Sequence, residues 1–350
     1  MTGKSMDWHK ITPDIVFGRG WDQTEPEFGR LPAHAEKTLP EKVWKMRRNS
    51  SGMYAEFMTD SPNVTIRWEV EDDVRGEPNF NICAESGIDL YVLVGKKWRF
   101  AVALTASGNV NEVPALVQLT GKKRLVRLYF PFRNCLRSME VGTDSGASFA
   151  WNHPGDVLPI AYYGSSIIHG SYGSRAGNGI TQILGREFNR PVINLGFSGS
   201  AKLEAEMADL LAELNPCCYL IDPLPNADVA LLEDRLEIFL RKLCSVRKNI
   251  PVILLTDADR RNAWLYRKNI QAHNKKRETA ARIVKQLQPE FPRLFLIDMK
   301  NAMGNDFEGT IDGIHPDELG VWRFSSYLIR ELRKKQISIS FDLSCHIGIV

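Results

Sequence analysis

The chain has 350 residues, which is enough for two domains that each bury a core of their own. Its hydrophobic fraction of 43% and charged fraction of 25% are those of an ordinary globular protein, and a net charge of +3 is too small to predict a nucleic-acid partner. No apolar run approaches the ~20 residues of a membrane-spanning helix, so we expect no membrane span.

Residues 1–150 have the pattern of a β domain. Short runs rich in Val, Ile, Tyr, Phe and Trp alternate with turn signals such as S-P at 61–62 and G-K-K at 121–123. The run at 65–70 alternates polar and apolar residues, as a half-buried strand does. No helical period interrupts these runs, which favours an N-terminal β-sandwich of jelly-roll type. The predicted strands cover 52–58, 63–70, 88–94, 98–104, 115–119 and 125–130.

Residues 151–335 follow a different pattern, in which short apolar runs alternate with helical periods. Strands that are buried on both faces by the helices between them are typical of a parallel α/β sheet. We expect a flavodoxin-like, three-layer α/β/α domain with five parallel strands in the order 2-1-3-4-5. The segment 151–156 marks the boundary, and the tail at 336–350 has no predicted role. The predicted strands are 158–163, 192–195, 218–221, 252–256 and 294–298, and two predicted helices span 203–214 and 231–243.

Cysteines, basic residues and the N-terminus carry few functional signals. The six cysteines form no C-x-x-C motif, so we expect buried free thiols and neither a disulfide framework nor a zinc site. The densest basic cluster, K-K-R at 275–277, lies in a helical pattern and is interpreted as a solvated helix face. The first residues lack the apolar region of a signal peptide, which favours a cytoplasmic location, or an extracytoplasmic one if a leader has been removed.

Residues capable of nucleophilic chemistry follow the predicted parallel strands. Ser166 follows the first strand in the run Y-G-S-S-I, whereas Asp312 and His315 follow the last strand in the run D-G-I-H-P. Because sites in such sheets lie beyond the carboxyl ends of the strands, we expect these residues to meet at one rim. A serine nucleophile needs a base, and the base needs an orienting partner; His315 and Asp312 are suited to these roles.

Acyl transfer also builds an oxyanion, which needs preorganised hydrogen-bond donors. The candidates are the backbone N–H of Ser166, the backbone N–H of Gly199 after the second strand, and the side-chain amide of Asn226 after the third strand. A glycine at 199 permits close approach of a substrate. Each assignment has an alternative: Gly199 serves turn geometry alone, Asn226 is an Asx-turn residue, and Asp312 only caps the final helix.

Four short blocks resemble the SGNH (GDSL-type) hydrolases in order and approximate spacing. They are G-S-S at 164–166, the Gly199 loop, L-P-N at 224–226 and D-x-x-H-P at 312–316. The chain is most similar to a bacterial subfamily with Y-G-S-S-I-T-Q-G and N-L-G-F-S-G blocks and an N-terminal β-sandwich. The runs G-W at 20–21, R-L-P-A at 30–33 and V-W-K at 43–45 also look like that sandwich. The resemblance implies that Ser166 is the nucleophile, that Asp312 and His315 complete the triad, and that Gly199 and Asn226 complete the oxyanion hole.

The chain departs from the family pattern at several positions. Ser165 replaces the usual Asp of G-D-S, and Leu224 and Ala227 replace the Gly and Asp of G-x-N-D. I-H at 168–169 stands where T-Q is usual, which places His169 near the nucleophile as a packing residue or a substrate contact. Arg175 in the nearby Gly-rich run is either structural or a contact for an acidic substrate.

Together these observations favour a serine esterase that hydrolyses an acyl ester. The family resemblance and the attached sandwich suggest an O-acetyl group on a carbohydrate as substrate. The predicted mechanism needs no metal and no organic cofactor. One alternative is a lysophospholipase or thioesterase for longer acyl chains, and another is a catalytically silent carbohydrate-binding protein. A nucleotide binder is disfavoured, because bulky residues occupy 166–169, where a phosphate-cradling loop would lie. The sequence carries no signal for an oligomeric state.

Overall fold

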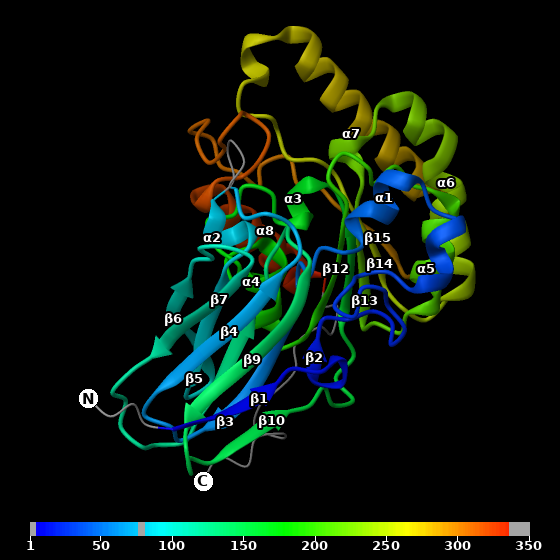
Figure 1. Cartoon of the computed structure of the whole chain (residues 1–350). Coiled ribbons are helices and arrows are strands. Elements are labelled where there is room, and N and C mark those ends of the chain that lie inside the picture. The colour runs from blue at the N-terminus through cyan, green and yellow to red at the C-terminus, as the bar shows by residue number, and fades with distance from the viewer. Residues whose placement is uncertain (1–4, 76–80, 336–350) are drawn as a thin grey trace.

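The structure is a computed structural model, and it describes residues 5–75 and 81–335. This part of the chain forms two units that lie side by side, an antiparallel β-sandwich and a parallel sheet covered by helices (Figure 1). The expected tail at 336–350 lies outside the described residues, as does Cys345. The remaining cysteines are free thiols: Cys135, Cys218 and Cys244 are buried, whereas Cys83 and Cys217 are partly exposed.

Two antiparallel sheets form the sandwich. Within the described residues, one sheet has four strands in the order β1-β9-β4-β7, and the other has six, in the order β10-β3-β8-β5-β6 with β2 paired to β3. Short helices fill the connections. The strands are β1 (Met6–Lys10), β2 (Val16–Phe17), β3 (Tyr54–Thr59), β4 (Val64–Val70), β5 (Ile88–Val94), β6 (Lys97–Leu104), β7 (Val110–Leu116), β8 (Arg124–Tyr129), β9 (Leu136–Asp144) and β10 (Phe149–Asn152). The helices are η1 (Pro13–Ile15), η2 (Ala33–Lys37), α1 (Glu41–Met46) and α2 (Ile82–Glu85).

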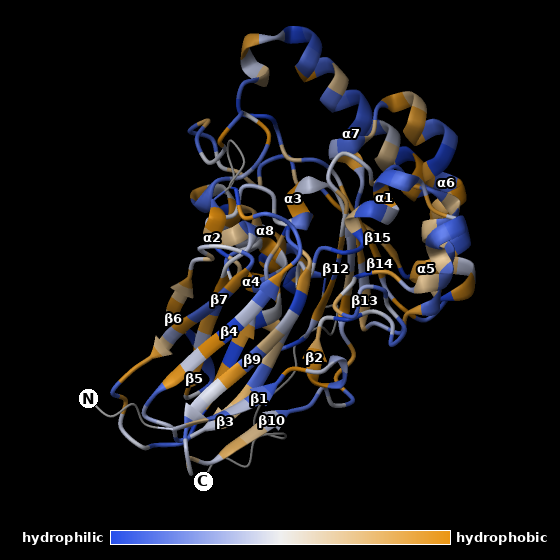
Figure 2. Ribbon diagram, in the orientation of Figure 1, coloured by the Kyte–Doolittle hydropathy of each residue, from blue (hydrophilic) through white to orange (hydrophobic). Residues whose placement is uncertain are grey.

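Alternation along the strands builds the sandwich core. In β4, Ile66 and Trp68 are fully buried between the sheets, whereas the intervening Arg67 points outward and pairs with Glu112 and Glu140 on the neighbouring strands. Figure 2 shows the resulting alternation of hydrophilic and hydrophobic positions along the strands. The Trp68 indole donates to the carbonyl of Ser86 at 3.0 Å, so its one polar atom is satisfied inside the core.

Several sandwich elements differ from the sequence prediction. The strand expected at 115–119 is β7, which starts earlier than predicted. Pro114 interrupts the sequence pattern of this strand. The proline is tolerated because β7 is an edge strand. β9 was not predicted, although it lies in the middle of its sheet. Opposite Glu69 and Val70 of β4, strand β9 carries one extra residue, Arg137. This β-bulge breaks the apolar alternation of β9.

The second unit contains the predicted parallel sheet. Its strand order among the described residues is β12-β11-β13-β14-β15, which confirms the expected order 2-1-3-4-5. All pairings within it are parallel, so the carboxyl ends of the strands share one rim. The strands are β11 (Ile160–Gly164), β12 (Val192–Gly196), β13 (Cys218–Asp222), β14 (Val252–Leu255) and β15 (Leu294–Ile297). The helices are α3 (Ser166–His169), α4 (Ile180–Phe188), α5 (Ala205–Glu213), η3 (Leu224–Asn226), α6 (Val229–Val246), η4 (Ala263–Leu265), α7 (Arg267–Leu287) and α8 (Glu318–Lys334).

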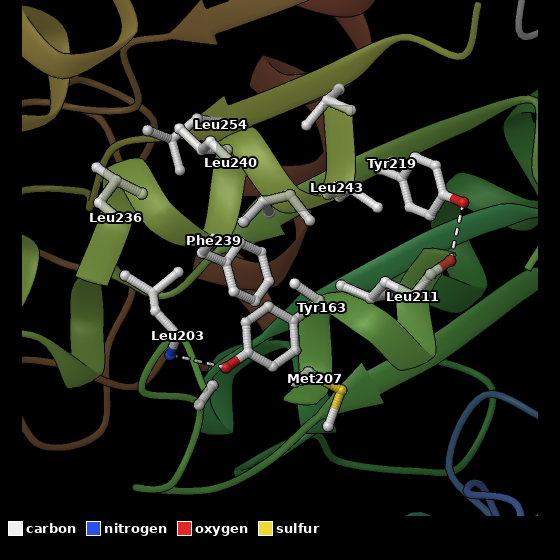
Figure 3. Packing of buried hydrophobic residues seen from close by; sticks show 14 of the residues in the cluster. Tyr163, Leu203, Met207, Leu211, Tyr219, Leu236, Phe239, Leu240, Leu243 and Leu254 are labelled. Atoms are coloured by element: carbon white, nitrogen blue, oxygen red, sulfur yellow. Dashed lines mark hydrogen bonds between the residues drawn. The ribbon is translucent and has the colours of Figure 1, made fainter. Parts of the chain in front are cut away.

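Helices cover both faces of this sheet, which gives the three layers. Helices α4 and α8 pack on one face, and α5, α6 and α7 pack on the other. Figure 3 shows part of the second layer: the ring of Tyr163 from β11 stacks on Phe239 of α6 at a centroid distance of 5.5 Å. The Tyr219 hydroxyl donates to the Leu211 carbonyl at 2.9 Å, which ties β13 to α5.

The two units are joined by a segment of the N-terminal part. Leu31, Ala35, Leu39 and Val43 are buried in the same core cluster as α5 and α6 of the α/β unit. The chain therefore crosses onto the second unit before it returns to form most of the sandwich.

Candidate active site

Ser166 is the first residue of the short helix α3, which begins directly beyond β11. The hydroxyl of the preceding Ser165 accepts from the N–H of Ile167 at 3.3 Å and so caps this helix. Asp and Ser are both good N-caps, which explains how Ser165 replaces the usual Asp. Gly164 is required at the end of the strand, since a Cβ there would lie 2.9 Å from the side chain of Ile168 and 3.1 Å from the carbonyl of Asp222.

Ser166, His315 and Asp312 form one hydrogen-bonded chain, although they come from opposite ends of the α/β unit. The Ser166 Oγ lies 2.8 Å from His315 Nε2, and His315 Nδ1 lies 2.7 Å from Asp312 Oδ2. Because a carboxylate only accepts, Nδ1 carries the hydrogen and Nε2 is free to accept from the serine hydroxyl. The geometry matches a nucleophile, a base and an orienting carboxylate.

The loop between β15 and α8 holds Asp312 and His315 in place. Asp312 Oδ1 accepts the backbone N–H groups of Ile314 at 2.9 Å and His315 at 2.8 Å. Partial burial raises the pKa of Asp312, but the hydrogen bonds from His315 and Ile314 outweigh it and leave the pKa below its usual value. Asp312 is therefore ionised at neutral pH.

Two further contacts brace this loop and were not expected from the sequence. The ring of Tyr172 stacks on the His315 imidazole with a centroid distance of 4.3 Å. Tyr172 adopts a left-handed backbone conformation with φ +67°, which is costly for a residue with a side chain and is often found near functional sites. On the other side, Gly313 has φ +87° and abuts the side chain of Asn262, and its carbonyl accepts the N–H of Arg261 at 2.9 Å.

Gly199 and Asn226 lie on the neighbouring loops of the same rim. Gly199 has φ +67°, and apart from its chain neighbours no atom lies within 4 Å of where its Cβ would be, so this side of the residue is open. Within the described residues, the N–H groups of Ser166 and Gly199 donate to no other protein group. Hydrogen bonding orients the Asn226 amide so that Oδ1 accepts from Ser200 N at 3.2 Å and Ala201 N at 3.1 Å. This leaves its Nδ2 group as a donor.

His169 and Arg175 both have structural partners. His169 is completely buried, and its ring contacts Ser198 and Arg30, so the structure places it as a packing residue and not as a contact for substrate. Arg175 pairs with the buried Asp89, donates to the Tyr91 hydroxyl at 2.8 Å and lies over the ring of Phe100. Its side chain therefore joins the sandwich to the loop after α3.

The basic cluster at 275–277 corrects the prediction of a solvated helix face. Lys275 is exposed, but Lys276 and Arg277 are buried. Lys276 Nζ lies 2.6 Å from Asp257 Oδ2, and Arg277 Nη1 lies 2.8 Å from Asp259 Oδ1. The acidic partners follow β14, so Lys276 and Arg277 face the site rim and only Lys275 of the cluster faces the solvent.

A second buried carboxyl, Asp222, lies at the end of β13. Burial and the nearby Asp257 carboxylate raise the pKa of Asp222 to about 8, although the Lys276 ammonium opposes this shift. Burial raises the pKa of Asp257 too, but His273 at 2.9 Å and Lys276 lower it overall. Asp222 is thus largely protonated at neutral pH, whereas Asp257 is ionised.

Two cavities that share Asp259 and Arg260 in their linings lie beyond the end of β14. One, of about 20 Å³, has a mixed lining: it includes Ile167, Pro225 and Ile314, which neighbour the site residues in sequence, and the charged residues Asp257, Asp259 and Arg260. The other, of about 320 Å³, has the rings of Trp264 and Phe307 in its lining. Among the described residues, no group of three or more His, Cys, Asp or Glu side chains is arranged to hold a metal ion, and no helix there is long and apolar enough to cross a membrane.

A three-layer α/β/α unit with this hydrogen-bonded chain at its rim defines a class of acyl hydrolases. Residues 158–333 match the GDSL-like lipase/acylhydrolase family, and residues 6–149 match the N-terminal domain of SGNH-hydrolase-type esterases. The chain belongs to the GDSL-like lipase/acylhydrolase family and is an esterase of the SGNH type. No curated protein sequence matches the chain.

Solved structures resemble the whole chain and not only its second half. A candidate GDSL-like lipase from Bacteroides ovatus is 28% identical with a TM-score of 0.89, over 96% of this chain and 100% of that one. A salicylyl-acyltransferase from a tetracycline biosynthetic pathway is 18% identical with a TM-score of 0.73, over 95% and 99%. An acetyl xylan esterase from Butyrivibrio proteoclasticus is 12% identical with a TM-score of 0.57, over 95% and 98%. The last two likenesses are of fold.

Proposed function

We propose that this protein is a serine esterase that removes short acyl groups, foremost O-acetyl groups, from a carbohydrate. The observation that carries the proposal is the hydrogen-bonded chain from Ser166 Oγ through His315 to Asp312, with distances of 2.8 and 2.7 Å. A serine with such partners is activated for attack on an acyl carbon.

The reaction follows from the geometry in two halves. Ser166 Oγ attacks the ester carbonyl while His315 Nε2 takes the hydroxyl proton, and the carbonyl electrons form an oxyanion. The N–H groups of Ser166 and Gly199 and the amide of Asn226 stabilise this charge. The C–O bond then breaks, and His315 returns the proton to the departing alcohol. Water next attacks the acyl-serine with His315 as base, which releases the carboxylic acid and restores Ser166.

The preference for a short acyl group rests on the smaller cavity. Its volume of about 20 Å³ is near the minimum that holds one water molecule. Its lining includes Ile167, Pro225 and Ile314, which adjoin the proposed nucleophile, oxyanion donor and base in sequence, and Asp257, Asp259 and Arg260 make other parts of it polar. A methyl group fits such a space, whereas an octanoyl chain needs room elsewhere.

The carbohydrate part of the proposal has two supports. The fold is shared with an acetyl xylan esterase. The lining of the larger cavity includes two exposed rings, Trp264 and Phe307, the amides of Asn301 and Asn305, and charged side chains such as Lys300. Ring faces flanked by amide groups suit a sugar, which has apolar faces and hydroxyl edges. The loop that carries Trp264 also contacts Gly313 through Arg261, so this cavity adjoins the triad.

A hydrolysis screen tests the proposal. Acetyl and octanoyl p-nitrophenyl esters and acetylated oligosaccharides are compared for the parent and for Ser166→Ala. We expect acetyl esters to be preferred and Ser166→Ala to lose nearly all activity. Hydrolysis by Ser166→Ala at the parent rate would refute the nucleophile. A strong octanoyl preference would instead favour a lysophospholipase or thioesterase.

A further inference from the structure

Arg30 is a fully buried arginine at the junction of the two units. It is only 2% exposed, and among the described residues no carboxylate pairs with it. A buried charge without a counter-ion is costly unless every donor is satisfied. The Arg30 guanidinium meets this condition with neutral acceptors: the carbonyls of Asn49 (3.0 Å), Met46 (2.8 Å), Asn194 (3.2 Å) and Gly196 (2.7 Å), and His169 Nε2 (3.3 Å).

These acceptors join three parts of the molecule. Met46 and Asn49 belong to the N-terminal part, Asn194 and Gly196 to β12, and His169 to the end of the nucleophile helix α3. The guanidinium also lies 4.9 Å from the ring centre of Phe197. Arg30 thus fixes the carboxyl end of β12 just before the chain enters the Gly199 loop.

The contact with Arg30 sets the tautomer of His169. A guanidinium only donates, so Nε2 of His169 must accept, and the ring hydrogen then resides on Nδ1. Nδ1 lies 3.0 Å from Ser198 Oγ and donates to it. Burial, together with the positive charge of Arg30, lowers the pKa of His169 well below its usual value, which keeps the ring neutral.

Ser198 directly precedes Gly199 in the loop. The Ser198 hydroxyl also lies 3.2 Å from Ser171 Oγ and accepts from Arg133 at 3.4 Å. At the base of the loop, a Cβ on Gly196 would lie 2.2 Å from the backbone nitrogen of His169, so strand and helix are in close backbone contact. The His169 carbonyl in turn accepts from Ser51 of the N-terminal part at 2.7 Å.

We propose that Arg30 and His169 are positioning residues that hold the Gly199 N–H in place as an oxyanion donor, so that the N-terminal part completes the catalytic machinery. This inference rests on the proposed function. Neither residue touches the reacting atoms; each acts through the Ser198–Gly199 backbone. An oxyanion donor acts mainly in the transition state, so misplacing it lowers kcat more than it raises KM.

The test compares two substitutions of one side chain. His169→Leu keeps bulk but removes both polar contacts, whereas His169→Gln can still accept from Arg30 and donate to Ser198. With p-nitrophenyl acetate, we expect His169→Leu to lower kcat by about tenfold or more with KM changed by less than about threefold. His169→Gln should regain most of the lost kcat. His34→Leu, a substitution of an exposed histidine near the same junction, is the control and should match the parent.

A second variant keeps the test decisive if His169→Leu folds poorly. Ser198→Ala removes a single hydroxyl, and we expect it to lower kcat severalfold while Tm stays close to that of the parent. A boronic acid that forms a tetrahedral adduct on Ser166 should bind His169→Leu and Ser198→Ala more weakly, in proportion to their loss of kcat/KM.

The inference is overturned if Ser198→Ala and His169→Leu both keep kcat within about twofold of the parent. It is also overturned if His169→Gln is as impaired as His169→Leu, because the ring shape and not its polar contacts would then matter. Parent-like hydrolysis by Ser166→Ala would refute the proposed function itself. Loss of activity in Ser166→Ala together with full activity in His169→Leu would refute this inference alone.

Discussion

The ammonium group of Lys276 donates to the carbonyl oxygen of Leu224 at 2.8 Å, and this bond ties helix α7 to the turn that carries Asn226. The same ammonium lies 2.6 Å from Asp257 Oδ2, and both side chains of this ion pair are buried. The turn that follows β13 is therefore fixed by a charge on a helix more than fifty residues further along the chain.

Lys276→Met should destabilise the protein by about 3 kcal/mol, because it leaves the Asp257 carboxylate buried with His273 as its one remaining side-chain partner among the described residues. Denaturant unfolding measures the change. Lys275→Met, at the exposed neighbouring position, is the control and should change the free energy of unfolding by less than about 0.5 kcal/mol. Equal effects of the two substitutions would mean that the buried pair contributes no special stability.

Asp312→Asn should lower kcat by roughly 10⁴-fold while the fold is retained. The Asn Oδ1 can still accept the N–H groups of Ile314 and His315, but its NH₂ group would face His315 Nδ1. The imidazole hydrogen would then move to Nε2, which could no longer accept from Ser166. Steady-state kinetics with p-nitrophenyl acetate measures the loss.

The control for this prediction is the same substitution at Asp317, which caps helix α8 through Gly320 N at 2.9 Å. Asn caps about as well as Asp, so Asp317→Asn should leave kcat near the parent value. If Asp312→Asn lost less than tenfold, Asp312 would serve mainly as a loop cap, and the site would work as a Ser–His dyad.

The stability of the protein should depend on pH through Asp222. Its pKa is raised to about 8 in the folded state, against about 3.9 in an unfolded chain. Between these values the folded state holds a proton that the unfolded state has lost, so the free energy of unfolding falls as pH rises, by about 1.4 kcal/mol per pH unit. The whole of this contribution is present below about pH 4 and is lost above about pH 8.

Asp222→Asn removes this titration. We expect the variant and the parent to have similar stability near pH 4 and the variant to become progressively more stable than the parent up to about pH 8. Urea unfolding at several pH values checks this trend, with the exposed Asp234→Asn as a control that should follow the parent. A constant difference between Asp222→Asn and the parent across this range would show that Asp222 is already ionised in the fold.

Trp264→Ala should lower the efficiency with which an acetylated oligosaccharide is hydrolysed and leave the hydrolysis of p-nitrophenyl acetate unchanged. We expect KM for the oligosaccharide to rise about tenfold, because the variant loses the ring face in the larger cavity. Trp322 on α8 is also exposed, at 64%, and lies outside that cavity lining, so Trp322→Ala is the matched control. An unchanged KM for Trp264→Ala would remove the structural support for a sugar at this position.

The α/β unit was readily predicted from the sequence because each strand is a short apolar run and each connection has a helical period. The position of Ser166, Asp312 and His315 at one rim followed from the rule that strand ends converge in a parallel sheet. Strand β9 was missed because the extra residue Arg137 disturbs its alternation. The prediction depends on regular spacing, and a bulge removes that regularity.

The supporting residues of the site were harder to predict. Lys276 and Arg277 resemble any exposed basic pair on a helix, and only the fold shows that Asp257 and Asp259 lie against them. Arg30 lies in a run that resembled the family, but its acceptors are mostly backbone carbonyls, which leave no trace in the sequence. Contacts of this kind are set by tertiary packing and not by local pattern.

The apolar residues Leu31, Ala35, Leu39 and Val43 extend the core of the α/β unit. A fragment that starts at residue 151 would therefore lack four apolar members of this core and expose part of the cluster that they now help to bury. We expect the hydrolase half, expressed alone, to present this apolar surface to solvent and to aggregate. Engineering of this esterase therefore has to keep residues 31–43 together with the α/β unit.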